Sequence, residues 1–177
     1  GVAPRPLRED HQDGRVVVVN GPGQDDDLAY SGARLAGAAR LERGADRALL
    51  ALQGPKAAAV MARFCPDAAN LNFMRGADLS FDGAPCTITR SGYTGEDGFE
   101  ISVKESGAVA IAEALLDQPE VLPIGLGARD SLRLAAGLCL YGHDIDQPNT
   151  PVPAALACTI GKRRRAPAAF PRAQPLL

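Results

Sequence analysis

One stretch of the chain places two glutamates and an aspartate in and beside a short glycine-rich loop. Residues 91–101 read SGYTGEDGFEI and lie between two segments of strand-like composition. Glu100 alternates with Phe99 and Ile101, so its carboxylate points away from the apolar side chains of its own strand. A carboxylate held in a pocket can accept two parallel N–H bonds from a flat ring. By spacing alone, however, a glutamate that simply faces solvent is the commoner outcome.

A second group of candidates combines a guanidinium, an aromatic ring and an amide. Arg129 begins a predicted helix, and Arg133 follows one turn later with Asp130 between them. On pattern alone this is a surface helix with an Asp130–Arg133 pair, which contributes a few tenths of a kcal/mol. Tyr93 has a ring that can stack on a flat ligand or pack within its loop. Asn20 ends a run of valines, where a turn residue is expected.

These residues belong to sequence blocks whose order resembles that of the aminomethyltransferase (T-protein) of the glycine cleavage system. The blocks are LLALQGP at 49–55, SGYTGEDGFEI at 91–101, GLGARDSLRL at 125–134, GLCLYGHDID at 137–146 and TIGKRRR at 159–165. Each block is weak by itself, whereas all of them in the family's order form a specific pattern. The resemblance covers only the middle of that protein, so we expect this chain to be a central fragment.

The resemblance implies a folate site and a partner protein. Glu100 would bind the pterin ring of tetrahydrofolate, and Arg129 would contact the ligand in the folate cleft, with Arg133 as the substitute if the assignment is one turn off. Tyr93 and Asn20 would also lie at the folate. The family reaction transfers a methylene group from the aminomethyl-lipoyl carrier, the H-protein, to tetrahydrofolate and releases ammonia. The implied cofactor is therefore tetrahydrofolate, and the implied partner is the lipoylated H-protein.

The resemblance also predicts that this chain has no catalytic residue of its own. The family's catalytic aspartate belongs to a GG-x-x-D-D-L block, and Pro4 and Arg5 stand where its acidic pair is expected. Asp10 and Asp13 lack the surrounding motif. We therefore expect the polypeptide alone to be poorly stable and inactive as a transferase.

Two other functions remain compatible with these blocks. One is the folate-binding region of a related dehydrogenase of the dimethylglycine or sarcosine type, which a flavin-binding domain upstream in the parent gene would favour. The other is a vestigial fragment that binds folate without catalysis, which Pro4 and Arg5 favour. An intact Asp-Asp-Leu sequence upstream in the parent gene would remove the support for this second alternative.

Composition limits the partners and the compartment. The chain has 46% hydrophobic and 23% charged residues, typical of a soluble globular protein, and its net charge of -2 gives no reason to expect nucleic acid or a membrane as partner. No apolar run approaches the roughly 18 residues of a membrane span. Four scattered cysteines and two histidines predict no metal site and suit a reducing compartment. This means the bacterial cytoplasm, or the mitochondrial matrix in a eukaryote.

The elements that must position the candidate residues alternate between helices and strands joined by short turns. This pattern predicts an α+β fold with antiparallel sheets and packed helices. Strands are expected at 15–20, 48–53, 79–90 with a turn at 82–83, 99–103 and 157–161, and helices at 24–40, 56–64, 106–116 and 128–136. Residues 67–76 are expected to form a loop. Glu96 and Asp97 read as turn formers or exposed acids.

The resemblance implies a domain division of this α+β fold. Residues 1–47 would be a remnant of the N-terminal folate-binding domain, and residues 48–140 a ferredoxin-like middle domain. Residues 141–165 would return to the first domain. The proline-rich residues 166–177 are predicted to be a disordered tail.

Overall fold

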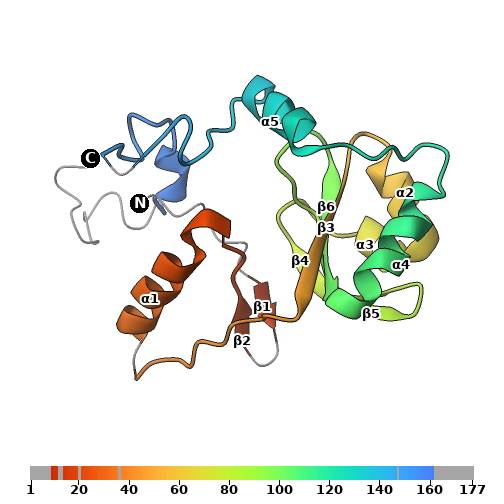
Figure 1. Cartoon of the computed structure of the whole chain (residues 1–177), viewed down its shortest axis with the longest axis horizontal. Coiled ribbons are helices and arrows are strands. Elements are labelled where there is room, and N and C mark those ends of the chain that lie inside the picture. The colour runs from red at the N-terminus through yellow and green to blue at the C-terminus, as the bar shows by residue number, and fades with distance from the viewer. Residues whose placement is uncertain (1–8, 12–13, 20, 36, 147, 162–177) are drawn as a thin grey trace.

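The computed structural model describes residues 9–161, apart from 12–13, 20, 36 and 147. At its centre lies a four-stranded antiparallel sheet with the strand order β3-β6-β5-β4 (Figure 1). The strands are β3 Arg47–Gln53, β4 Gly76–Phe81, β5 Ala84–Thr89 and β6 Gly98–Lys104. The predicted α+β class with antiparallel pairing is confirmed.

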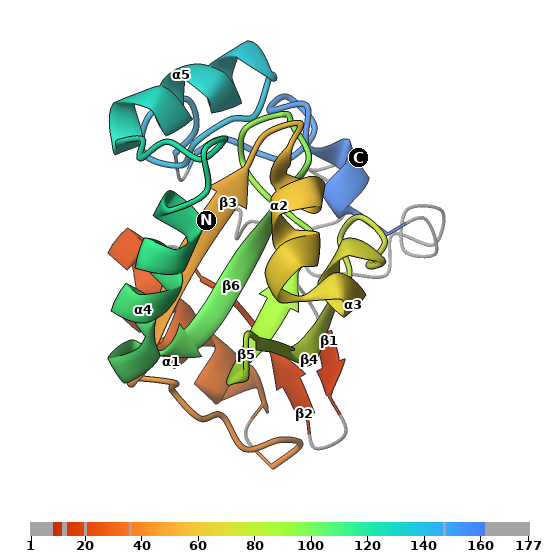
Figure 2. The ribbon, with the colours of Figure 1, turned by 90° about the vertical axis from the view of Figure 1, so that its right-hand side faces the viewer.

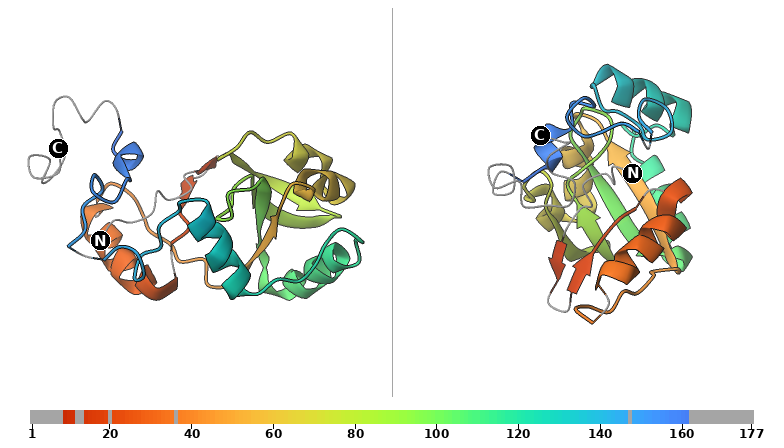
Figure 3. Two further views of the ribbon diagram at one scale, coloured as in Figure 1. Left: turned by 90° about the horizontal axis from the view of Figure 1, so that it is seen from above. Right: turned by 90° about the vertical axis from the view of Figure 1, so that its left-hand side faces the viewer.

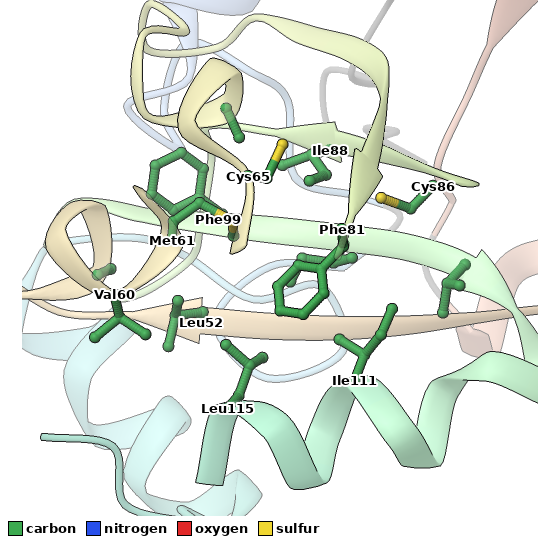
Figure 4. Packing of buried hydrophobic residues seen from close by; sticks show 14 residues of the cluster. Leu52, Val60, Met61, Cys65, Phe81, Cys86, Ile88, Phe99, Ile111 and Leu115 are labelled. Atoms are coloured by element: carbon green, nitrogen blue, oxygen red, sulfur yellow. The ribbon is translucent and has the colours of Figure 1, made fainter. Parts of the chain in front are cut away.

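One face of the sheet is covered by helices (Figure 2). These are α2 Ala57–Phe64, the short α3 Pro66–Ala69 and α4 Glu105–Leu116. Between the sheet and the helices lies the apolar core (Figure 4), whose largest fully buried side chains are Phe81, Phe99, Met61, Ile88, Ile101 and Val60. The opposite face of the sheet therefore carries the alternate residues of each strand.

Local sequence accounts for the central strands. Phe99, Ile101 and Val103 of β6 are 0%, 0% and 2% exposed, so the predicted alternation is confirmed. The β4–β5 hairpin turns at Asp82 and Gly83, whose φ values of 45° and 86° match the two positive angles of a type I′ turn. The aspartate–glycine pair fixes this turn, as predicted.

The last helix and the last strand of the sheet come in the opposite order from that of a ferredoxin-like domain. A ferredoxin-like domain runs β-α-β-β-α-β, whereas this sheet and its long helices run β3, α2, β4, β5, β6 and α4. A loop at 90–97 joins β5 to β6, and α4 follows β6. No helix is needed at the junction because neighbouring antiparallel strands require only a short connection.

The remaining described elements are the β1 Glu9–His11 and β2 Gly14–Val16 hairpin, the 3-10 turn η1 Gly21–Gly23, α1 Gln24–Leu35, α5 Leu126–Ala135 and the 3-10 turn η2 Ala157–Thr159. Of these, α5 and the β1–β2 hairpin lie next to the sheet, and α1 and η2 lie farther from it on the same side as the hairpin (Figures 1 and 3). Within the described residues, no helix combines the length and the apolar character needed to cross a membrane.

Several predicted elements outside the sheet are corrected. The expected buried strand at 15–20 ends at Val16, and Val17, Val18 and Val19 are 40–49% exposed because no described strand pairs with them. Helix α1 ends at Leu35 rather than at 40, close to Gly37 with its φ of 79°. The expected strand at 157–161 contains a 3-10 turn, and part of the expected loop at 67–76 belongs to α3. The predicted disordered tail lies outside the described residues.

Candidate functional site

Glu100 lies in the middle of β6, on the sheet face that α2, α3 and α4 leave uncovered. It is paired with Ala51 of β3 on one side and with Thr89 of β5 on the other. Its side chain is nevertheless only 15% exposed. The strand alternation thus aims a carboxylate away from the core, and neighbouring side chains shield it from most of the solvent.

The two oxygens of the Glu100 carboxylate have different surroundings. The Ser91 hydroxyl donates to Oε2 at 2.7 Å, and the Thr89 hydroxyl in turn lies 2.7 Å from the Ser91 oxygen. The other oxygen, Oε1, is 3.8 Å from Nη2 of Arg129, longer than a hydrogen bond. Among the described residues, Oε1 therefore keeps capacity to accept further N–H donors. A mostly buried carboxylate gains stability from such donors.

Arg129 and Tyr93 complete the cluster from two other segments. Arg129 lies in the first turns of α5, and its guanidinium carbon is 5.7 Å from the centre of the Tyr93 ring. The Tyr93 hydroxyl donates to the carbonyl of Cys139, and burial raises the pKa of Tyr93. An acid, a cation and an aromatic ring thus meet where β6, the 90–97 loop and α5 come together.

Another predicted position, Asn20, lies outside the described residues. Arg133 is described and does not join this cluster. Arg133, the alternative to Arg129, has a side chain only 4% exposed and is bound to the carboxylates of Asp130 and Asp144. Its guanidinium is therefore already occupied by partners within the chain.

Gln53, which is not among the site residues predicted from the sequence, holds the 90–97 loop against the end of β3. Its amide nitrogen donates to the carbonyls of Ser91 at 3.0 Å and Phe99 at 3.3 Å, and its amide oxygen accepts from the Thr94 hydroxyl at 3.1 Å. A methyl group at Gly98 would lie 2.5 Å from the Gln53 side chain. The glycine at this position leaves room for the amide. The LLALQGP block marks Gln53, but nothing local shows its distant partners.

Arg90 joins the two ends of the same loop. Its guanidinium donates two bonds to the Asp97 carboxylate, at 2.9 and 2.7 Å, and two more to the carbonyls of Ala69 and Leu71 at 3.0 and 2.9 Å. Arg90 lowers the pKa of Asp97. The expectation that Asp97 is a turn former or an exposed acid is therefore too weak, because its carboxylate anchors the loop.

The arrangement is suited to binding rather than to bond cleavage by its own groups. Glu100 can accept N–H donors, Tyr93 offers a ring face, and Arg129 supplies a positive charge. Within the described part of the chain, no three His, Cys, Asp or Glu side chains gather as a metal site. A separate groove of about 450 Å³ is lined by residues of all four strands and of the start of α4, Asp78 and Thr87 among them, and Glu100 is not one of its lining residues.

Comparison with known proteins identifies the family to which this sequence belongs. The family model of the GCVT N-terminal domain matches residues 9–164. Human mitochondrial aminomethyltransferase is 57% identical over 131 residues, which are 73% of this chain and 32% of that protein. The mitochondrial aminomethyltransferase of Gallus gallus is 48% identical over 163 residues, which are 91% of this chain and 38% of that protein.

A solved structure shares the fold. The glycine cleavage system aminomethyltransferase T from Bartonella henselae matches with a TM-score of 0.78 and 45% identity, over 90% of this chain and 44% of that chain. The chain spans about a third of the length of the curated relatives named above. Because the family model covers most of the sequence, the chain belongs to the GCVT N-terminal domain family.

Proposed function

We propose that this chain forms the pterin-binding part of an aminomethyltransferase of the glycine cleavage system. The complete enzyme would transfer a methylene group from the aminomethyl-lipoyl H-protein to tetrahydrofolate and release ammonia. Family membership supports the reaction class, and both relatives described above are named aminomethyltransferases rather than dehydrogenases. The observation that carries the proposal is the shielded Glu100 carboxylate with one oxygen still open to donors.

Each residue of the cluster has a role that follows from its chemistry. Glu100 accepts the ring N–H and the exocyclic amine of the pterin, since each carboxylate oxygen has two lone pairs and the bond from Ser91 uses only one. Arg129 offsets the negative charge of Glu100 and can donate to a pterin carbonyl. Tyr93 lines the site with its ring. Asn20 is proposed as a further contact near the folate.

Tetrahydrofolate brings the N5 atom that takes the methylene carbon. The contribution of this chain is to hold the pterin in a defined orientation, and orientation alone accounts for a large share of the rate in such transfers. No catalytic residue is proposed within the chain, so it binds folate without transferring the methylene group by itself.

The domain division belongs to the same proposal: 1–47, 48–140, 141–165 and 166–177, as the resemblance implies. The eukaryotic relatives named above are mitochondrial proteins. We propose the mitochondrial matrix for a eukaryotic parent of this chain and the cytoplasm for a bacterial one.

A calorimetric titration with tetrahydrofolate under nitrogen tests the site. The wild-type chain should bind saturably, and Glu100→Gln should weaken binding by about 1–3 kcal/mol, because the new amide presents donors to the donors of the pterin. Glu96→Gln is the matched control, since Glu96 is an exposed glutamate of the 90–97 loop next to β6. Equal affinity for the wild type and Glu100→Gln, or no binding by a folded chain, would refute the proposal.

A further inference from the structure

Arg133 is a buried cation whose partners come from both sides of a chain reversal. Its Nε donates to Asp130 at 2.8 Å within α5, and its Nη1 donates to the Leu138 carbonyl at 3.1 Å and to the Asp144 carboxylate. A buried guanidinium is tolerated only when its donors are matched by carboxylates and carbonyls. Arg133 therefore ties the segment 138–145 to the end of α5.

The same segment reaches the candidate site. The Asp144 carboxylate also accepts the Leu140 N–H at 2.9 Å, and this bond together with the Arg133 guanidinium lowers the pKa of Asp144. The neighbouring Cys139 carbonyl accepts the Tyr93 hydroxyl. The contacts thus run from Arg133 through Asp144 to the backbone that holds Tyr93 in place.

The helix closes this path into a ring. Arg129 lies one turn before Arg133 on α5, 5.7 Å from the Tyr93 ring and 3.8 Å from Glu100. The 90–97 loop also touches the C-terminal end of α5 directly, since a methyl group at Gly95 would lie 2.6 Å from the Cβ of Ala136. Moving the segment 138–145 would therefore disturb Tyr93 and, through the Tyr93 ring, the Arg129 guanidinium beside the Glu100 carboxylate.

We propose that Arg133 is a positioning residue of the folate site, which clamps 138–145 and so places Tyr93 and Arg129 beside Glu100. This inference rests on the function proposed above. It differs from a general stabilising role because the buried apolar cluster of the sheet, within the described residues, contains no side chain of α5. Loss of the clamp should therefore disorganise the site and leave the sheet folded.

The test uses the full 177-residue chain and four variants. Arg133→Gln removes the cation, Asp144→Asn removes its distal partner with little change of shape, and Arg133→Lys restores the charge without the branched donors. Arg75→Gln is the control, because Arg75 is exposed and the same charge is lost. Tetrahydrofolate affinity is measured by calorimetry, core stability by urea unfolding, and exposure of 138–145 by amide hydrogen exchange.

Arg133→Gln and Asp144→Asn should each weaken folate binding about 10- to 100-fold, the loss seen when residues that support the ligands of a metal site are removed. Exchange in 138–145 should rise, the urea midpoint of the sheet should change little, and Arg133→Lys should regain part of the affinity. Wild-type affinity in Arg133→Gln and Asp144→Asn would overturn the inference, as would a Lys variant as weak as the Gln variant.

The two proposals fail in different ways. If the wild-type chain binds no folate, the proposed function is wrong and the positioning role falls with it. If the wild type binds and Glu100→Gln weakens binding while Arg133→Gln does not, only the positioning role is wrong. Equal loss of folate binding and of sheet stability in Arg133→Gln would instead make Arg133 a residue of the fold, which also overturns the inference.

Discussion

Replacing Gln53 and Gly98 separately and together tests how the site loop is held. The two residues are directly paired across β3 and β6, and the Gln53 side chain lies over Gly98. Gln53→Ala removes the amide that bonds the Ser91 and Phe99 carbonyls and the Thr94 hydroxyl. Gly98→Ala introduces a methyl group where that amide sits. Gly98 is not among the glycines with positive φ, so alanine suits its backbone.

The contacts set the magnitudes. Gln53→Ala loses three hydrogen bonds to partly or fully buried groups, and at about 1 kcal/mol each the free energy of unfolding should fall by about 2–3 kcal/mol. In Gly98→Ala the methyl group would lie 2.5 Å from Gln53 Cδ, so the glutamine must swing out and the same bonds are lost. The cost should again be about 2–3 kcal/mol. In the double variant the methyl group occupies vacated space, so the double variant should cost no more than either single one.

Urea unfolding followed by circular dichroism measures these free energies, and the slope with urea checks that unfolding stays cooperative. The expected coupling energy in the double-mutant cycle is about 2–3 kcal/mol, in the direction of mutual rescue. Additive losses would show that the two substitutions act at independent places, and the contact between Gln53 and Gly98 would then not hold the loop. Gly107→Ala is a mild control, because its methyl group would meet only Val103 at an ordinary 3.4 Å.

Two further predictions concern the core and the loop anchor. Phe81 is 2% exposed and stacks on Phe64 at 4.7 Å, so Phe81→Ala should cost about 3–5 kcal/mol in urea unfolding. Val109→Ala, at a side chain 66% exposed, should change little, and a comparable loss in both would contradict the assigned core. The Arg90 guanidinium lowers the pKa of Asp97, so the stability that this carboxylate contributes is present above its ordinary pKa and is lost as pH falls through the lowered value. The advantage of the wild type over Asp97→Asn should shrink on acidification, and an advantage that stays constant from neutral to strongly acidic pH would contradict the ion pair.

The central elements could be predicted from the sequence because their signals are local. The alternation of Phe99, Ile101 and Val103 identifies β6, and Asp82-Gly83 identifies the hairpin turn. Such signals act between residues that are close in sequence. The run of valines at 17–19 shows the limit, because a β-branched run predicts burial only if another segment pairs with it.

The cluster around Glu100 could be predicted only in part. The resemblance names Glu100, Arg129 and Tyr93, and these three are neighbours in the structure. The side chains that hold them in place, Gln53 and Arg133, depend on contacts between distant segments, such as Gln53 with Ser91. No spacing rule reports contacts of this kind. Arg133 has the same residue type as Arg129, and only burial and the contacts in the folded chain distinguish their roles.

The most direct measurement is a crystal structure of the chain with bound tetrahydrofolate. We expect a pterin N–H nitrogen about 2.8 Å from Oε1 of Glu100, the usual length of a charge-assisted hydrogen bond. We also expect the pterin ring to contact Tyr93 and Arg129. A pterin bound elsewhere, for example in the groove beside Asp78 and Thr87, with Glu100 still bonded only to Ser91, would contradict a folate site at Glu100.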